Sequence, residues 1–420
     1  MFQRTELPDG PRVISARLPG TRSLSVAAYV LVGSRLETRE QSGMAHFMEH
    51  LTFKGTQSFP TTRALAEAIE GVGGTSNAAT DRESTVYWTR LPVREAQRGF
   101  DVLSELIARP LLRSEDIARE RDIIVEEIRS YRDDPGQYVY NIFDETFFGD
   151  HSLGWEIAGD EESVRGLADE DIRAFWRTGY RPANVVVAVA GDISHDDVVE
   201  LAARTFGSGN GSVPHFGAAP TLPSSRCRVL VRDTSQAHLC LGIPSLPRDH
   251  PDQWALELLN TVLGDGSSSR LFLHLREDQG LAYDVHSFTT DYADCGALQI
   301  YAGVAPEDLS KALKSMLVEL AQLRDELVPA EELTKARNYA RGRLELRLEE
   351  GRNLAAWLGA QEALHDRVLT LDEAVASLDA VTSEDILRVA RQLIKDEALS
   401  LAVITSGRHG RGLERQLRLP

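Results

Sequence analysis

The sequence predicts an α+β protein of two homologous domains, each a mostly antiparallel β-sheet with helices packed on one face. The chain has 420 residues, which is more than one hydrophobic core usually serves. A stretch at 207–225 is rich in Gly, Ser and Pro, lacks an amphipathic period and divides the chain into nearly equal pieces. We therefore predict domains over 1–206 and 226–420, joined by a linker over 207–225.

The third observation is that both pieces present the same order of predicted elements, as an internal duplication would. A β-prone stretch comes first and is followed by a helix that ends at a glycine, a strand pair, two further helices, and finally a helix with a hydrophobic strand. The matching segments are 23–34 and 227–246, 44–55 and 253–264, 93–110 and 306–323, 114–128 and 330–344, and 164–192 and 375–407. Sheets with helices segregated to one face fit this order.

Composition excludes several classes of protein. A hydrophobic content of 42% is enough for packed cores and excludes a largely disordered chain. Asp and Glu outnumber Lys and Arg by 64 to 46, so a nucleic-acid partner is not expected, because phosphate contacts need basic surface. An acidic chain is compatible with basic partners or substrates, but solubility alone is the favoured explanation of the charge.

Location is also predicted from the sequence. No apolar run is long enough for a membrane span, and the N-terminal residues show neither a signal peptide nor a transit pattern. Three cysteines, Cys227, Cys240 and Cys295, lie in no CxxC pair and are typical of buried thiols in a reducing compartment. These features together predict a cytoplasmic protein without membrane contact.

The clearest chemical motif is an HxxEH string at residues 46–50. On a helix, His46 and His50 lie about 40° apart around the axis, on one face. Two imidazoles so placed suit zinc, which prefers nitrogen ligands in tetrahedral geometry. Glu49 lies about 60° to the other side of His46, where a carboxylate can take a proton from a metal-activated water as general base. The order is the inverted form of HExxH. Histidines that cap or pack without a metal are the alternative.

A third ligand is predicted on the charged helix at 114–128. Its isoleucines share one face, and Glu120 and Glu127 lie on the edge of that face, whereas Glu126 points to solvent. Carboxylates at such an edge are costly unless they are paired or bind a metal. We predict Glu127 as the ligand and Glu120 as the residue that supports it. Ion pairs with Arg119 or Arg121 are the alternative.

These motifs resemble a known family. The segment 33–56, GSRLETREQSGMAHFMEHLTFKGT, together with ERDIIVEEI at 120–128, is similar to the M16 metallopeptidases, the group of pitrilysin, insulin-degrading enzyme and mitochondrial processing peptidase. The resemblance covers essentially the whole chain, including the duplication. It implies one zinc ion per chain held by His46, His50 and Glu127, with Glu49 as general base. It also matches Glu120 to an additional active-site glutamate.

The resemblance also implies substrate contacts. In similar proteins the edge strand that matches 73–91 adds the substrate to the sheet, which places Asn77 and Ala78 near the scissile bond. Backbone pairing of this kind makes little demand on the peptide sequence. Within GDGSSSRLFLHLREDQGLAYDVHS at 264–287, Arg276 and Tyr283 match residues that approach the substrate, with Tyr283 near the developing oxyanion. From their residue types alone, the strand is ordinary sheet and Arg276 an ordinary salt-bridge partner.

The second half lacks a comparable metal motif. Alignment of Gly55 with Gly264 puts Ala255, Leu258 and Leu259 at the positions of the HxxEH residues, and the counterpart of Glu127 falls near Arg343. The sequence therefore predicts a zinc endopeptidase that cuts peptides or unfolded segments and is catalytic in its first domain alone. A homodimer or a heterodimer with an inactive homologue is implied by the resemblance. A non-catalytic scaffold or partner subunit on the same fold is the alternative function.

Overall fold

The computed structural model describes residues 2–209, 216–217, 219–220, 227–365 and 367–420. Most of the linker predicted at 207–225 lies outside these residues. The chain forms two compact units, and each unit contains one β-sheet with helices, as predicted. The first unit contains Met1–Arg129, Glu156–Gly217 and Glu345–Thr370, and the second contains Ser130–Trp155, Ala218–Leu344 and Leu371–Pro420. Each half of the sequence thus contributes one segment to the unit built mainly by the other half.

The sheet of the first unit has six strands in the order β1-β2-β6-β3-β5-β4. Every neighbouring pair is antiparallel except β2 and β6, which run parallel. The strands are β1 (Gln3–Glu6), β2 (Arg12–Arg17), β3 (Ser23–Val30), β4 (Thr75–Thr80), β5 (Thr85–Pro92) and β6 (Val185–Gly191). Central β6 reads VVVAVAG and is buried along its whole length, as expected of a strand covered on both faces. β1 and β4 are the edge strands.

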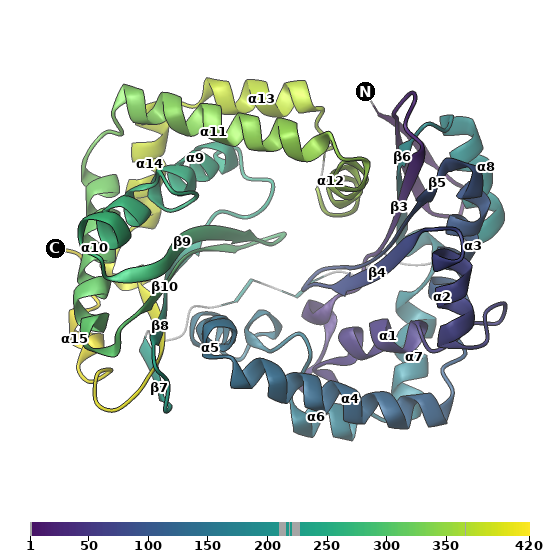
Figure 1. Ribbon diagram of the computed structural model, residues 1–420, viewed down its shortest axis with the longest axis horizontal. Coiled ribbons are helices and arrows are strands. Elements are labelled where there is room, and N and C mark those ends of the chain that lie inside the picture. The colour runs from purple at the N-terminus through teal and green to yellow at the C-terminus, as the bar shows by residue number, and fades with distance from the viewer. Residues whose placement is uncertain (1, 210–215, 218, 221–226, 366) are drawn as a thin grey trace. The chain divides into compact units, whose positions relative to one another are not determined.

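Helices cover both faces of this sheet (Figure 1). The helices of the unit are α1 (Met44–Thr52), α2 (Thr62–Glu70), α3 (Ala96–Ala108), α4 (Ser114–Asp133), α6 (Glu161–Gly166), α7 (Asp169–Gly179), α8 (His195–Phe206) and α12 (Gly351–Leu364). All of these except α12 lie on one side, and their apolar side chains form a core with the inward residues of β3, β5 and β6. The other face is covered in part by α12, which comes from the second half of the sequence and contacts β2, β3 and β6.

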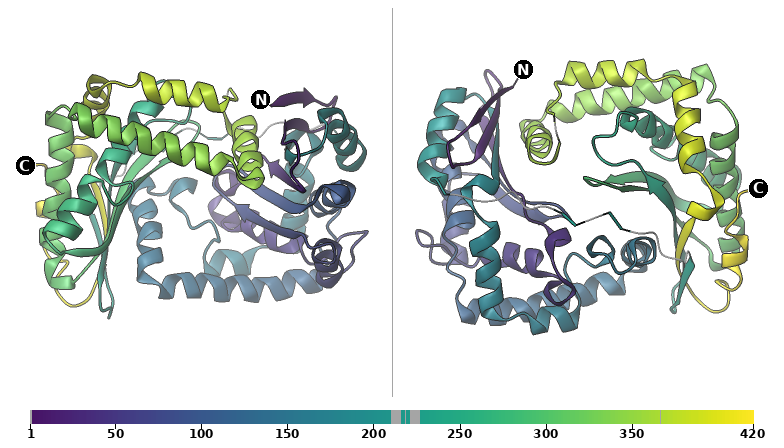
Figure 2. Two further views of the ribbon diagram at one scale, coloured as in Figure 1. Left: turned by 45° about the horizontal axis from the view of Figure 1, so that its top comes forward. Right: turned by 180° about the vertical axis from the view of Figure 1, so that it is seen from behind.

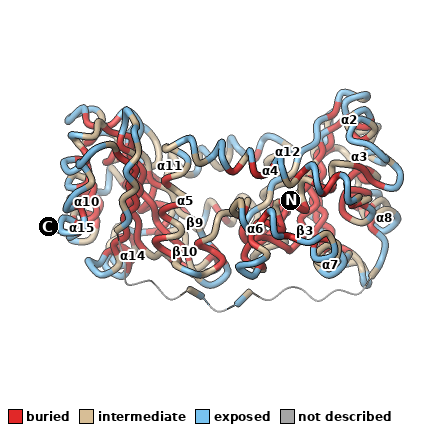
Figure 3. Tube along the Cα trace, turned by 90° about the horizontal axis from the view of Figure 1, so that it is seen from below, coloured by how far each residue is buried: buried red, intermediate tan, exposed pale blue. Residues whose placement is uncertain are grey.

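The sheet of the second unit has five strands in the order β7-β11-β8-β10-β9. Its one parallel pair is β7 with β11. The strands are β7 (Cys227–Val231), β8 (Ala237–Ser245), β9 (Ala282–Asp291), β10 (Gly296–Val304) and β11 (Ser400–Thr405). The central strands β8, β10 and β11 are buried along most of their length, and much of the trace beside the label β10 is drawn red, as buried, in Figure 3. Strand β9 is an edge strand, as β4 is in the first unit.

The helices of the second unit repeat the arrangement of the first. They are α5 (Pro135–Phe148), α9 (Gln253–Leu263), α10 (Leu309–Asp325), α11 (Ala330–Leu348), α13 (Leu371–Ala380), α14 (Ser383–Leu393) and α15 (Leu413–Gln416). Apolar residues of α9, α10 and α14 form the larger core on one face of the sheet. By residue number, these helices are teal (α9), green (α10) and yellow (α14) in Figure 2. Helix α5, from the first half of the sequence, packs its phenylalanines on the other face, against β8 and β11.

Short helical turns link these elements. The 3₁₀ turns are η1 (Ser34–Leu36), η2 (Arg39–Gln41), η3 (Val93–Glu95), η4 (Ser152–Gly154), η5 (Pro182–Asn184), η7 (Pro306–Asp308) and η8 (Asp396–Ala398). A π-helical segment, η6, covers Phe272–Asp278. Among the helices of the described residues, none has both the length and the apolar character needed to cross a bilayer.

Candidate metal centre

Helix α1 carries the HxxEH string and is held firmly at its start. Met44, Phe47 and Met48 are fully buried under the sheet, which leaves the histidines and Glu49 on the partly exposed side. Gly43 caps the helix with φ at 94°, and the Cβ of any other residue there would meet the backbone oxygen of Ala158 at 2.6 Å. Both the left-handed conformation and this close approach require glycine.

The side chain of Glu37 forms hydrogen bonds with the N-terminus of the same helix. Its side chain is 6% exposed and accepts hydrogen bonds from the backbone N–H of Gly43 at 2.9 Å and of Ala45 at 2.7 Å. These N–H groups are among those that a helix leaves without intrahelical partners at its N-terminus. Burial raises the pKa of Glu37 to about 8, although the two backbone hydrogen bonds and nearby Arg82 act in the opposite direction. Glu37 therefore fixes where α1 begins, ahead of its histidines.

Helix α4 presents the second part of the site. The helix predicted over 114–128 is confirmed and continues to Asp133. Ile117, Ile124 and Ile128 are buried in the core of the first unit. Glu120 is 3% exposed and Glu127 is partly exposed, at the edge of this face as their spacing predicted.

The two helices bring three potential ligands together. His46, His50 and Glu127 each offer one ligand atom, and these atoms lie within 4.8 Å of one another. Nε2 of His50 lies 3.4 Å from Oε2 of Glu127, and Nε2 of His46 lies 3.8 Å from its Oε1. Two imidazoles and a carboxylate form a donor set of catalytic zinc sites, in which a fourth position stays open. The residues therefore fit a zinc ion.

Glu120 lies behind this cluster and orients it. Its Oε2 is 3.2 Å from Nδ1 of His50, and its Oε1 is 2.8 Å from Nζ of Lys54. A carboxylate at Nδ1 leaves Nε2 of the same ring facing the ligand cluster. Burial raises the pKa of Glu120, but hydrogen bonds to His50 and Lys54 outweigh burial and hold that pKa below its usual value. The ionised form that supports His50 is thus the favoured one.

Ion pairing with Arg119 or Arg121 was the alternative for the two glutamates. Arg119 lies 3.9 Å from Asp116, and Arg121 donates to the backbone oxygens of Val164 and Leu167. The contacts of Glu120 are with His50 and Lys54 instead. Glu120 therefore contacts the histidine cluster rather than the neighbouring arginines.

The two histidines differ in their electrostatics. Burial, together with the nearby His50, lowers the pKa of His46 to about 4. Burial also lowers the pKa of His50, but hydrogen bonds to Glu120 and Glu127 outweigh it and raise this pKa to about 9. Nδ1 of His46 is buried and has no hydrogen-bond partner among the residues that the structure describes. His46 is therefore neutral at physiological pH, which is the form that can ligate a metal.

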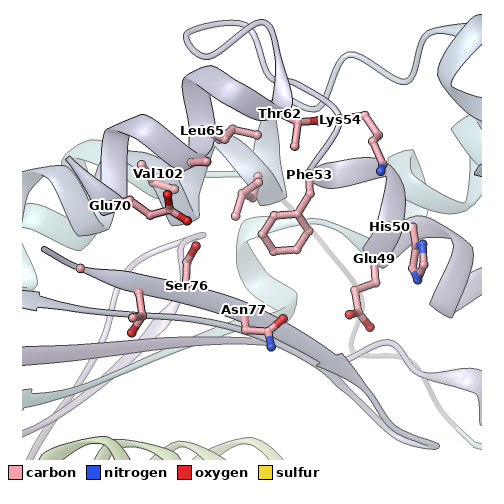
Figure 4. Close-up of a pocket in the computed structure, with 14 residues that line it drawn as sticks. Glu49, His50, Phe53, Lys54, Thr62, Leu65, Glu70, Ser76, Asn77 and Val102 are labelled. Atoms are coloured by element: carbon pink, nitrogen blue, oxygen red, sulfur yellow. The ribbon is translucent and has the colours of Figure 1, made fainter. Parts of the chain in front are cut away.

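Glu49 projects beside the cluster into a cavity of about 460 Å³ (Figure 4). Oγ1 of Thr80 donates to Oε2 of Glu49 at 2.5 Å, which fixes the carboxylate toward β4. Burial raises the pKa of Glu49, in part offset by the hydrogen bond from Thr80. Phe53, Leu65 and Val102 provide apolar wall to this cavity. A carboxylate with a raised pKa in a cavity beside a ligand cluster is typical of a general base.

The edge strand β4 borders the same cavity. Asn77 lines the cavity and is exposed, and its Oδ1 accepts from the backbone N–H of Ala78 at 2.9 Å. Ala78 pairs with Tyr87 of β5, so its strand has a partner on one side only. The strand reads TSNAAT and contains no charged residue or proline, whereas the opposite edge strand β1 carries Arg4 and Glu6. Charges and prolines are what usually protect an edge from another strand.

Arg276 and Tyr283 lie together in the second unit. Nη1 of Arg276 donates to the backbone oxygen of Tyr283 at 2.6 Å, and its guanidinium lies over the rings of Tyr283 and Phe272, 4.9 Å from each centroid. Tyr283 is 77% exposed. A π-helical turn such as the one that carries Arg276 is frequent at functional sites. The substrate contacts of both residues remain predictions.

In the second unit, the positions that correspond to the HxxEH residues are occupied by apolar core residues. Ala255, Leu258 and Leu259 of α9 are buried in its main core. Arg343 donates to the hydroxyl of Tyr339 at 2.8 Å and lies 3.8 Å from Asp265. Within the described ranges, His46, His50 and Glu127 are the one group of His, Cys, Asp or Glu residues whose geometry suits a metal ion.

Sequence reasoning did not assign roles to several residues of the site. Glu37, Phe53 and Lys54 lie within the segment that carries the family resemblance, and Thr80 lies on the predicted strand. A carboxylate six residues ahead of a helix N-cap has no recognised capping spacing, so Glu37 left no local signal. Lys54 lies two residues beyond the end of α1, so helical periodicity did not indicate that it shares a partner with His50.

Comparison with known proteins identifies the family of the chain. The family model described as insulinase (peptidase family M16) matches residues 12–161, and the model of the M16 inactive domain matches 167–339. The chain belongs to peptidase family M16. The division into an M16 domain followed by an M16 inactive domain agrees with a ligand cluster in the first half alone.

Individual M16 relatives match over nearly the whole chain. An uncharacterized zinc protease of Streptomyces coelicolor is 36% identical over 93% of this chain and 87% of its own length. An uncharacterized zinc protease of Bacillus subtilis is 35% identical over 96% of this chain and 98% of its own. The crystal structure of a peptidase M16 inactive domain from Pseudomonas fluorescens superimposes with a TM-score of 0.90 at 20% identity, covering 97% of this chain and 98% of that one. That similarity shows the fold.

Proposed function

We propose that this M16 protein is a zinc-dependent endopeptidase that cleaves peptides or unfolded protein segments. The observation that carries the proposal is the convergence of His46, His50 and Glu127, with their ligand atoms within 4.8 Å, beside a cavity that contains Glu49. The relatives named zinc proteases support the identity of the metal. We propose one zinc ion per chain.

Different residues of the chain have different roles in the proposed hydrolysis of a peptide. When bound, zinc supplies Lewis acidity, which polarises a peptide carbonyl and acidifies water. Glu49 accepts the proton of the attacking water and passes it to the leaving amine, and its raised pKa suits both steps. Thr80 holds that carboxylate in one orientation. Glu120 keeps His50 turned toward the ligand cluster.

The edge strand β4 supports the proposal that the substrate is an extended, unfolded peptide. Its free side can hydrogen-bond to an extended peptide backbone, which would lie along Asn77 and Ala78 beside the cavity. A peptide that joins a sheet in this way must be locally unfolded. We therefore propose that the enzyme acts on flexible peptides and that Arg276 and Tyr283 of the second unit contribute to substrate and oxyanion binding.

A non-catalytic role on the same fold is the second candidate. It is favoured by the similarity to an M16 inactive domain of known structure. The cluster on α1 and α4 argues for the enzyme, because a scaffold has no need of the cluster or of Glu49. Dimerisation, with itself or with an inactive homologue, and a cytoplasmic location are proposals that rest on the resemblance and on the sequence.

The test combines metal analysis with a single substitution. Purified protein is expected to contain one equivalent of zinc and to cleave an unstructured peptide, and Glu49→Gln should retain the zinc but lose about 10²-fold or more in kcat. Glu126→Gln, which removes an exposed carboxylate of α4, is the matched control and should keep full activity. Absence of both zinc and cleavage in the parent protein would favour the scaffold.

A further inference from the structure

The π-helical turn η6 of the second unit is held from outside by polar contacts that the proposed chemistry does not explain. Leu271, just before the turn, and Leu275 within it are fully buried in the core of this unit, whereas Leu273 between them is exposed. π-helical turns are rare and are frequent only at functional sites. A rare backbone conformation persists where the surrounding structure supports it.

The first of these contacts joins η6 to a buried carboxylate of α10. Nδ1 of His274 donates a hydrogen bond to Oε1 of Glu319. Glu319 is 3% exposed, and its Oε2 has no hydrogen-bond partner among the described residues. A buried carboxylate costs free energy unless it is paired. The chain therefore retains a costly group whose described hydrogen bond is with a residue of η6.

Two further contacts hold the ends of the same turn. Ser315 lies one helical turn before Glu319 on α10, and its Oγ donates to Oε1 of Gln279, which follows η6, at 3.2 Å. Before η6, Nε and Nη2 of Arg270 donate to the two carboxylate oxygens of Glu332 on α11, at 3.0 Å and 2.7 Å. The turn is thus tied to its neighbours at its start, middle and end.

The turn in its middle also carries Arg276, two residues after His274. The guanidinium of Arg276 donates to the backbone oxygen of Tyr283 and lies over its ring, which is otherwise largely exposed. The backbone N–H of Leu281 donates to the oxygen of Leu275 at 2.8 Å, which joins η6 to the start of β9. A displacement of η6 would therefore move Arg276 and Tyr283 together.

We propose that His274 and Glu319 are positioning residues, whose contact fixes η6 so that Arg276 and Tyr283 are ordered before the substrate arrives. Side chains that are already ordered lose less entropy when they bind. Neither His274 nor Glu319 touches the peptide in this role. The inference rests on the proposed function, which gives Arg276 and Tyr283 their substrate contacts.

The first test measures the turn itself and needs no activity. His274→Leu removes the donor, whereas His274→Asn keeps one, because the amide nitrogen of asparagine occupies nearly the place of Nδ1. The backbone N–H groups of Gly280 and Leu281, which bond to oxygens of η6, are followed by hydrogen–deuterium exchange. Their exchange should become about tenfold faster in His274→Leu and stay at the parental rate in His274→Asn.

A double variant guards against misfolding. His274→Leu alone leaves the carboxylate of Glu319 buried and unpaired, whereas His274→Leu combined with Glu319→Leu removes both partners and leaves no buried charge. The double variant should show the same faster exchange, no larger than that of the single variant. His409→Leu, at an exposed histidine outside η6, is the matched control and should leave the exchange unchanged.

The second test measures cleavage of an unstructured peptide, with rates expressed per zinc-loaded protein. The single and double variants should raise KM about tenfold and change kcat by less than about threefold, and His274→Asn should keep KM within about twofold of the parent. Zinc content should be unchanged, because the ligand cluster lies in the first unit. A purely structural role would lower the active fraction, and hence kcat, without raising KM.

The outcomes separate this inference from the proposed function. A parental KM in the His274→Leu and double variants, with or without faster exchange, would overturn the positioning role and leave the proposed endopeptidase standing. Failure of His274→Asn to restore both readouts would overturn it as well. A parent protein that cleaves no peptide would refute the proposed function, and the positioning role with it.

Discussion

The carboxylate of Glu120 on α4 lies 3.2 Å from Nδ1 of His50 on α1. This contact joins the two helices behind the ligand cluster, and Lys54 completes it by holding the other oxygen of Glu120 at 2.8 Å. A histidine whose Nδ1 is hydrogen-bonded to a carboxylate presents Nε2 in a fixed direction and as a more basic ligand.

Substitution Glu120→Gln is therefore expected to weaken metal binding by about 10- to 100-fold, because the neutral amide supports His50 less strongly. Competition with a chromophoric chelator measures the affinity directly. Glu126→Gln on the same helix removes an exposed carboxylate and should leave the affinity unchanged. If both variants bind zinc as the parent does, Glu120 has no positioning role.

Substitution Glu37→Gln should lower the free energy of unfolding by about 1–3 kcal/mol, because the amide offers one acceptor oxygen in place of two and leaves one of the two buried backbone N–H groups unpaired. Urea denaturation monitored by circular dichroism provides the measurement. Glu40→Gln, at an exposed position of the neighbouring 3₁₀ turn, is the control and should change stability by less than about 0.5 kcal/mol. A loss no larger than that of the control would show that Glu37 does not anchor α1.

Replacing either of two glycines by alanine should change the free energy of unfolding, in opposite directions for the two positions. A Cβ at Gly359 of α12 would lie 2.4 Å from Cε2 of Tyr29 and 2.8 Å from Cβ of Ala188, so Gly359→Ala is expected to cost about 1–3 kcal/mol. A Cβ at Gly342 of α11 would meet nothing within 4 Å, so Gly342→Ala should stabilise by about 0.5–1 kcal/mol. Thermal unfolding of the two variants tests both. A neutral Gly359→Ala would contradict the close packing of α12 on the first sheet.

Asp385 makes part of the stability depend on acid pH. Hydrogen bonds from the side chain and backbone of Thr382, together with Arg388, lower its pKa to about 2. Because this pKa is depressed by folding, the stabilisation is fully present above about pH 4, the unfolded value, and is lost as pH falls toward 2. Asp385 is partly exposed, so Asp385→Asn should cost less than about 1 kcal/mol at pH 7.

The measurement for Asp385 is the unfolding free energy of both proteins as a function of pH. The difference between parent and Asp385→Asn should shrink between pH 4 and pH 2. A difference that stays constant over this range would mean that the carboxylate charge does not contribute.

Much of the fold was predictable because the periodicity of apolar residues reports local structure. The helix at 114–128 is α4, and the helix at 253–264 is α9, which ends at Leu263 as its following glycine indicated. Helices α5 and α12 were not predicted. Their hydrophobic residues cover more than one face, and each packs on the sheet of the unit formed mainly by the other half of the chain.

The sequence by itself determined the candidate chemistry. The HxxEH spacing places two imidazoles on one helical face, and the period of α4 puts Glu120 and Glu127 at the edge of its apolar side. Both inferences need only the geometry of a single helix. They predict candidate ligands and a candidate base without any knowledge of how the helices pack.

The tertiary structure alone decided which groups meet. The contact of Glu120 with Lys54, the hydrogen bonds that Glu37 accepts at the start of α1, and the cavity between α5, β9 and β10 each join segments whose sequence separation carries no periodic signal. A pattern of apolar residues shows which face of an element is buried but not the surface against which it packs. That choice depends on the complementary shapes and polar partners that come together when the sheets and helices assemble.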